Sequence, residues 1–149
     1  MKLTNGFDIS ASALTAQRFR MDVISSNIAN ADTTRAKLVN GRWVPYQRKV
    51  VVMEPNRPAS FSQLFQTALN GQVGEGVRVT RVIEDDSPFR IVYNPTHPDA
   101  DENGYVQMPN VDILKEMVDL ISATRSYEAN VTALNATKAM ISKALEIGK

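Results

Sequence analysis

The sequence predicts an α+β protein whose long N- and C-terminal helices pack as an antiparallel, coiled-coil-like hairpin, with a small central region of strands and loops. Apolar residues repeat every seven positions at each end of the chain, whereas the β-branched runs and all seven prolines lie between the two ends. We therefore expect three parts: an N-terminal helical segment at 1–34, a strand and loop region at 35–109, and a long C-terminal helix at 110–149.

The N-terminal helix is predicted from about Asp8 to Ala31, with Asp8 as a plausible N-cap. Its apolar residues fall on one face at heptad spacing, and alanines and serines around them permit a close approach by another helix. The residues expected to pack on this face are Leu14, Met21, Ile24 and Ile28.

The C-terminal helix is predicted from Val111 to Ile147, with Asn110 able to cap its start. At 1.5 Å per residue it would be about 55 Å long, far longer than an average globular helix, so it needs a partner. Its expected packing residues repeat with heptad spacing or fall between the repeats: Ile113, Met117, Leu120, Tyr127, Val131, Leu134 and Ile141.

The central region is predicted to hold short strands at 50–53, 77–83 and 89–93, because these runs are β-branched or alternate between apolar and polar residues. The segment Trp43 to Tyr46 is expected to begin a further strand. Residues 62–69 are expected to form a short helix or an ordered loop. Pairs such as Asn103-Gly104 are turn signals between these elements.

Composition excludes several classes of protein. The formal net charge of +1 gives no global field toward nucleic acid or an anionic membrane, and the absence of cysteine excludes disulfides and thiol catalysis. The first residues lack the apolar core of a secretory signal, and no apolar run approaches the roughly 20 residues that span a bilayer. Export, if it occurs, is expected to use another route.

Motifs for metal or catalytic chemistry are incomplete. The run from Asp99 to Gly104 matches the first half of an EF-hand calcium loop, but Asn110 stands where the bidentate Glu should be. His97 is the only histidine, and no nucleophile and base can be named, so we expect neither an enzyme nor a cofactor. The basic residues Arg42, Arg48 and Lys49, interleaved with Trp43 and Tyr46, form too small a patch for nucleic acid.

The two apolar stripes can be buried in two ways. Packing them against each other gives a soluble helical hairpin, but the C-terminal helix carries further apolar residues that a single partner would leave exposed. Neighbouring subunits could cover that side, and a head-to-tail contact that does not close makes a helical fibre. Periodicity alone does not separate self-assembly from a helical-hairpin adaptor, and a calcium-binding module is a further alternative. The wider apolar set comprises Val111, Leu114, Val118, Ile121, Met140 and Ile147.

Four motifs nevertheless resemble one family. The run Ser26-Asn27-Ile28-Ala29-Asn30-Ala31-Asp32-Thr33-Thr34-Arg35 is similar to the end of the N-terminal helix in flagellar rod and hook axial proteins. The runs 45–49 and 94–100, and then 104–106 with 109–112, are similar to the proximal rod branch in order and spacing, so the resemblance covers essentially the whole chain. Many axial proteins have Gly and an aromatic residue after Thr34, where this chain has Arg35 and Ala36.

The resemblance implies a non-enzymatic structural subunit of the bacterial flagellar basal body that assembles through its terminal helices and transmits torque. It also implies export by the flagellar type III apparatus and a place in the rod as it crosses the cell envelope. The implied partners are other proximal and distal rod proteins, and the adaptor that joins the rod to the inner-membrane ring. The family-motif residues are Asn27, Ala29, Asn30, Thr33 and Thr34. Of these, Asn27, Asn30 and Thr34 are expected to end the first helix and contact neighbouring subunits.

Overall fold

The computed structural model describes residues 5–56, 65 and 76–147. The chain divides into two compact units. Unit 1 comprises Met1–Arg20, Val52–Arg81 and Ser122–Lys149, and unit 2 comprises Met21–Val51 and Val82–Ile121. Of the segment predicted at 62–69, only Phe65 lies within the described residues.

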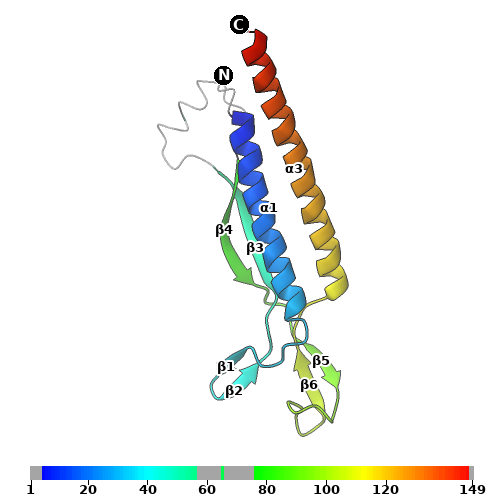
Figure 1. Ribbon diagram of the computed structural model, residues 1–149. Helices are drawn as coiled ribbons and strands as arrows, with labels where there is room; N and C mark the ends of the chain where they lie inside the picture. Colours follow the sequence, from blue (N-terminus) through cyan, green and yellow to red (C-terminus); the bar gives the residue numbers. More distant parts are fainter. Residues whose placement is uncertain (1–4, 57–64, 66–75, 148–149) are drawn as a thin grey trace. The chain divides into compact units, whose positions relative to one another are not determined.

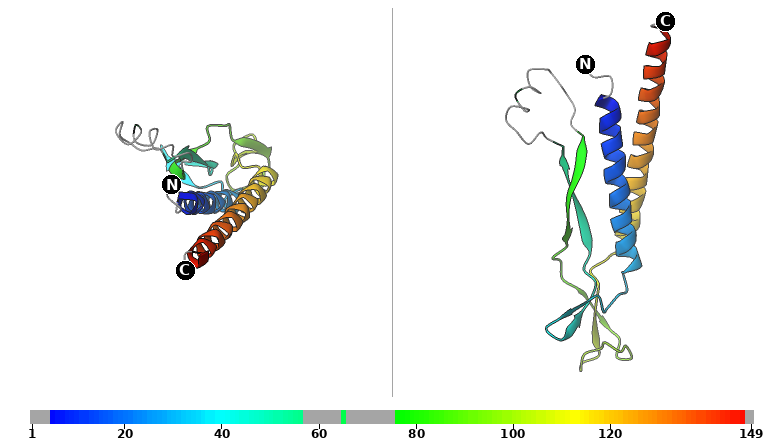
Figure 2. Two further views of the ribbon diagram at one scale, coloured as in Figure 1. Left: turned by 90° about the horizontal axis from the view of Figure 1, so that it is seen from above. Right: turned by 60° about the vertical axis from the view of Figure 1, so that its left-hand side comes forward.

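Two long helices begin and end the described chain (Figure 1). Helix α1 runs over Asn5–Ala29 and helix α3 over Ile113–Ile147, and the two run in opposite directions in each view (Figure 2). The predicted α+β fold with a helical hairpin and small central strand pairs is therefore confirmed. No helix among the described residues is both long enough and apolar enough to cross a bilayer.

Both predicted caps are wrong by a few residues. Helix α1 already includes Asn5, so Asp8 lies inside its first turn, where its negative charge suits the positive end of the helix dipole. Helix α3 begins at Ile113 because the Oδ1 of Asp112 accepts hydrogen bonds from the backbone N–H groups of Leu114 (3.0 Å) and Lys115 (3.4 Å). Asp112, rather than Asn110, caps this helix.

The described part of the central region forms three two-stranded sheets. Strand β3 (Lys49–Pro55) pairs with β4 (Val77–Glu84), so the predicted runs at 50–53 and 77–83 are confirmed as strands. Strands β1 (Lys37–Val39) and β2 (Arg42–Val44) form an antiparallel hairpin with Leu38 opposite Trp43. Asn40 and Gly41 both have positive φ, as a two-residue hairpin turn requires.

A third hairpin precedes α3. Strand β5 (Arg90–Tyr93) pairs antiparallel with β6 (Tyr105–Met108), and the Tyr93 and Tyr105 rings meet edge to face with centroids 5.3 Å apart. The sequence predicted β5 at 89–93 but gave no strand at β6. Gly104 has φ 78°, and a Cβ there would lie 2.9 Å from Cε2 of Tyr93, so the turn needs glycine.

Each unit has a small core. In unit 2, Ala31, Tyr46 and Val111 form a buried cluster, which joins the end of α1 to the segment before α3. In unit 1, Ala16 and Ala123 are buried, with exposed fractions of 2% and 0%. Val111 was expected among the residues that a single helical partner would leave uncovered. It is instead part of the unit 2 core, because it precedes α3.

Candidate functional site

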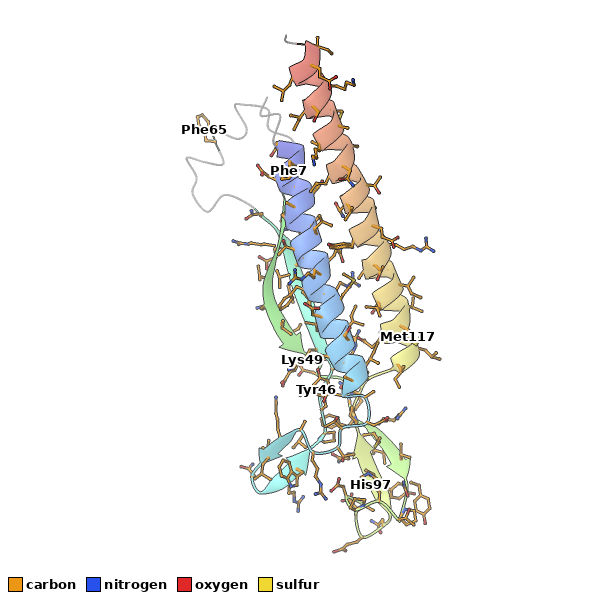
Figure 3. All side chains as sticks on the ribbon, in the orientation of Figure 1. Phe7, Tyr46, Lys49, Phe65, His97 and Met117 are labelled. Carbon is orange, nitrogen blue, oxygen red and sulfur yellow. The ribbon has the colours of Figure 1, made fainter. Side chains whose placement is uncertain are left out.

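The amide of Asn27 ties α1 to β3 and α3 within unit 2. Its Nδ2 donates to Oε2 of Glu116 and to the carbonyl of Lys49, each at 2.9 Å. Its Oδ1 accepts from the backbone N–H of Lys49 (2.9 Å) and from the hydroxyl of Tyr46 (3.0 Å). Tyr46 and Lys49 lie beside the end of α1 in Figure 3. An amide has two donors and two acceptor lone pairs, so Asn27 uses its full hydrogen-bonding capacity.

A fully buried carboxylate lies next to this amide. Glu116 has no exposed surface, and its Oε1 accepts a hydrogen bond from Nε of Arg48 at 2.7 Å. Partial burial alone would lower the pKa of Arg48, but hydrogen bonds and charge from Glu116, and then from Asp85, outweigh it and raise that pKa. A buried charge needs such partners, since an unpaired one is strongly destabilising.

Arg48 extends the cluster to the loop after β4. Its Nη1 lies 3.3 Å from Oδ2 of Asp85, and its backbone N–H donates to Oδ1 of Asn110 at 2.8 Å. The hydroxyl and the backbone N–H of Ser87 donate to Asp85 and, with Arg48, lower the pKa of Asp85. The Asn110 Nδ2 donates to the Asp85 carbonyl at 3.0 Å. Asn110 therefore fixes a loop rather than capping a helix.

The family-motif residues at the end of α1 make local and longer contacts. Asn30 Nδ2 donates to the Ser26 carbonyl at 2.9 Å, and Thr33 Oγ1 donates to Oδ1 of Asn30 at 3.2 Å. Thr34 Oγ1 donates to Oδ2 of Asp99 at 2.8 Å. Ala29 is exposed and is the last residue of α1.

Arg35, where the chain departs from many axial proteins, has a structural partner. Its Nε donates to Oδ1 of Asp99 at 2.7 Å, in the loop between β5 and β6. Hydrogen bonds from Arg35 and Thr34 lower the pKa of Asp99. The residues after Thr34 are therefore attached to the β5–β6 loop by a charged pair.

The same contacts occupy the suggested calcium loop. Asp99 would supply its first ligand, but both carboxylate oxygens of Asp99 already accept hydrogen bonds from Arg35 and Thr34. Nδ1 of His97 accepts from the backbone N–H of Asp99 at 3.1 Å, which is an ordinary turn contact. Among the described residues, no group of three or more His, Cys, Asp or Glu is arranged to hold a metal ion.

The predicted packing residues differ in burial along the helices. In unit 2, Ile24 is buried, Met21, Ile28 and Leu120 are half-buried, and Ile113 and Met117 are 44% and 50% exposed. Those in unit 1 are all half-buried: Leu14, Tyr127, Val131, Leu134 and Ile141.

Exposed apolar side chains gather on the first turns of α3. Leu114, Val118 and Ile121 are 76%, 66% and 56% exposed, and they adjoin Ile113 and Met117. Helical spacing places residues four and three apart on one face, so these side chains form an apolar surface, called here the α3 apolar face. Met117 lies near the start of α3 in Figure 3. In unit 1, Met140 and Ile147 near the end of α3 are 64% and 84% exposed.

An open groove of about 470 Å³ borders the α3 apolar face. Its apolar lining includes Ile113 and Leu114, with alanine, proline and valine side chains beside them, and polar or charged groups come from Asp32, Ser87, Arg90, Asn110 and Asp112. The groove therefore extends the apolar face toward a polar rim, an arrangement typical of protein–protein interfaces.

The comparisons with known proteins agree with the motifs. Residues 7–37 match the family described as flagella basal body rod protein, and residues 102–147 match the C-terminal family of the flagellar basal body rod FlgEFG proteins. The flagellar basal-body rod protein FlgC of Bacillus subtilis (strain 168) is 62% identical over 151 residues, covering 100% of both chains. FlgC of Salmonella typhimurium is 45% identical with the same coverage, and that of Borreliella burgdorferi is 42% identical, covering 99% of this chain and 98% of its own.

The helical hairpin, the motif at the end of α1 and these matches define a structural protein of the flagellar basal-body rod. Both terminal helices fall within family matches, and the likeness to the Bacillus protein extends over the full length. The chain belongs to the FlgC family of flagellar basal-body rod proteins.

Proposed function

We propose that this chain enters the rod by burying the α3 apolar face, and the groove beside it, against the terminal helices of neighbouring subunits. The observation that carries this proposal is the exposure of five large apolar side chains on the first turns of one helix, from 44% for Ile113 to 76% for Leu114. An apolar surface with a polar rim marks an interaction site more often than an isolated exposed residue does.

The apolar face supplies a large part of the free energy that association requires. Fully burying a Leu, Ile, Val or Met side chain contributes about 1.5–3 kcal/mol. Five partly exposed side chains therefore supply on the order of 5–10 kcal/mol, which is comparable with the estimated 4–15 kcal/mol that association costs in lost freedom. A second contact is needed for stable binding, and the exposed residues near the end of α3 provide one.

The half-buried residues predicted to pack would complete these contacts. In this proposal Leu14, Tyr127 and Leu134 lie in a close-packed helical layer, which resists compression and transmits torque along the rod. The regions 1–34 and 110–149 act as the rod core, and 35–109 lies outside it. Asn30, Thr33 and Thr34 end the first helix, next to the neighbouring subunits.

Membership of the family supports the remaining parts of the proposal. The neighbours are other proximal and distal rod proteins and the adaptor to the inner-membrane ring. The chain reaches them through the flagellar type III export apparatus and functions, without catalysis, within the basal body as it crosses the envelope. The support is that relatives matched over their full length are named flagellar basal-body rod proteins.

The test places a charge on the α3 apolar face. Val118→Asp is expected to leave the purified chain folded, because Val118 is already 66% exposed, but to remove the protein from isolated basal bodies and abolish swimming. Asn103→Asp places the same charge at an exposed position of the turn between β5 and β6, outside the proposed rod core, and is expected to swim normally. Normal swimming by Val118→Asp would contradict the proposed interface.

A further inference from the structure

Heptad repeats leave the pairing of α1 and α3 ambiguous. Leu14, Met21 and Ile28 repeat every seven residues on α1, and Leu120, Tyr127, Leu134 and Ile141 do the same on α3. Sliding one helix past the other by seven residues again places apolar residues opposite apolar residues. Burial of the stripes therefore cannot by itself choose between these registers.

The structure nevertheless shows one register in both units. In unit 2, Asn27 of α1 hydrogen-bonds Glu116 of α3. In unit 1, a Cβ on Gly6 would lie 3.8 Å from Oγ1 of Thr137. Gly6 lies three heptads before Asn27 and Thr137 lies three heptads after Glu116, so the two contacts belong to the same antiparallel register.

We propose that Asn27, Glu116 and Arg48 form a register key, a buried polar cluster that selects this pairing over pairings shifted by one heptad. Glu116 and Asn27 are 0% and 1% exposed, and of the four hydrogen bonds of the Asn27 amide, the one to Glu116 joins the two helices and is made only in the observed register. A single buried polar pair is known to fix helix register when apolar repeats cannot.

Each shifted register breaks the key. A shift of one heptad in one direction places Ala123 opposite Asn27, so the amide faces a methyl group and Glu116 loses its amide donor. A shift in the other direction places Pro109 opposite Asn27, before the start of α3. The heptad stripes of the two helices tolerate both shifts, whereas the buried polar groups tolerate neither.

The absence of cysteine makes the register directly measurable. A chain carrying Gly6→Cys, Thr137→Cys and Ala144→Cys can form the disulfide 6–137 in the observed register or 6–144 after a shift of one heptad. The full-length protein is unfolded, refolded in a glutathione redox buffer and digested, and the two disulfides are quantified by mass spectrometry. We expect the 6–137 bond to exceed the 6–144 bond by at least about tenfold, equivalent to one buried hydrogen-bonded pair.

Removing the key should reduce this preference. In the same cysteine background, Asn27→Leu, Arg48→Met and Glu116→Leu together replace the polar cluster by apolar side chains, and the ratio is expected to fall to within about threefold of unity. Asn30→Ala, which removes side-chain hydrogen bonds made only around the end of α1, is the matched control and should retain the parent ratio. Far-UV circular dichroism establishes that each scored variant is helical, because an unfolded chain would also give mixed disulfides.

Should the apolar triple variant lack helical signal, Asn27→Ala is scored instead, since it leaves the Arg48–Glu116 pair intact. It is expected to raise the share of the 6–144 bond several-fold over the parent. A folded variant without the key that still forms the 6–137 bond at the parent ratio would overturn the proposal.

Discussion

Replacing Asn27 by alanine should be among the most destabilising single changes in unit 2. The substitution removes four hydrogen bonds. Glu116 keeps Arg48, and the Tyr46 hydroxyl lies 3.5 Å from the Ser26 hydroxyl, but the N–H and C=O of Lys49 lose the Asn27 amide. At roughly 1–3 kcal/mol for each buried polar group left unpaired, the expected loss is about 3 kcal/mol. That is a large part of the 5–15 kcal/mol that typically separates folded from unfolded protein.

Urea unfolding of the purified full chain, followed by far-UV circular dichroism, measures this loss as a fall in the midpoint at constant slope. Asn30→Ala is the matched control, because it removes two side-chain hydrogen bonds at the end of the same helix: the one donated to the Ser26 carbonyl and the one accepted from the Thr33 hydroxyl. The control should cost about 0.5–1.5 kcal/mol. If Asn27→Ala lowers the free energy of unfolding by no more than Asn30→Ala does, burial does not make the Asn27 amide important for stability.

Two further predictions concern charge and backbone. Because hydrogen bonds from Ser87 and contact with Arg48 lower the pKa of Asp85, its contribution to stability is complete above its unfolded pKa of about 3.9 and is lost as pH falls through the folded pKa. The urea midpoint of the parent should therefore fall more steeply below about pH 4 than that of Asp85→Asn. If the two midpoints fall in parallel with pH, Asp85 does not contribute this stability. Gly104→Ala should destabilise the chain by about 1–3 kcal/mol, through positive φ and the close Tyr93 ring. Gly41 also has positive φ but no close neighbour, so Gly41→Ala should lower the free energy of unfolding by about 1 kcal/mol in thermal or urea unfolding. Equal losses for the two variants would show that the Tyr93 ring adds nothing to the cost at Gly104.

The sequence was sufficient to predict the helices because their heptad spacing is a local property of the chain. The strands of the β3–β4 pair were predicted for the same reason, since runs of β-branched residues are locally visible. Strand β1 has three residues, too few for an alternating pattern to stand out, and β6 was missed although it is as long as β5, which the sequence predicted.

The polar cluster could not be predicted in the same way. Glu116 lies beside the predicted stripe of Ile113, Met117 and Leu120 and does not interrupt its spacing, so no local signal marked it as buried. Its partner Arg48 is 68 residues away in the sequence, and only the fold brings the two together. The motif residue Asn27 was expected to contact neighbouring subunits, but within this chain all four of its hydrogen bonds are internal. Its proposed contact with neighbours stays a prediction.

Arg35 shows how a departure from a family pattern can be understood only in three dimensions. A flexible Gly would leave the chain after Thr34 free to turn, whereas Arg35 pairs with Asp99 in the β5–β6 loop. The pairing depends on a residue 64 positions away, so periodicity and local motifs carry no trace of it.

Cryo-electron microscopy of intact basal bodies would test most directly whether the terminal helices are incomplete surfaces until they assemble. The account predicts that Leu114, Val118 and Ile121 lie buried against helices of adjacent rod subunits. A reconstruction in which these three side chains face solvent within the rod would contradict it.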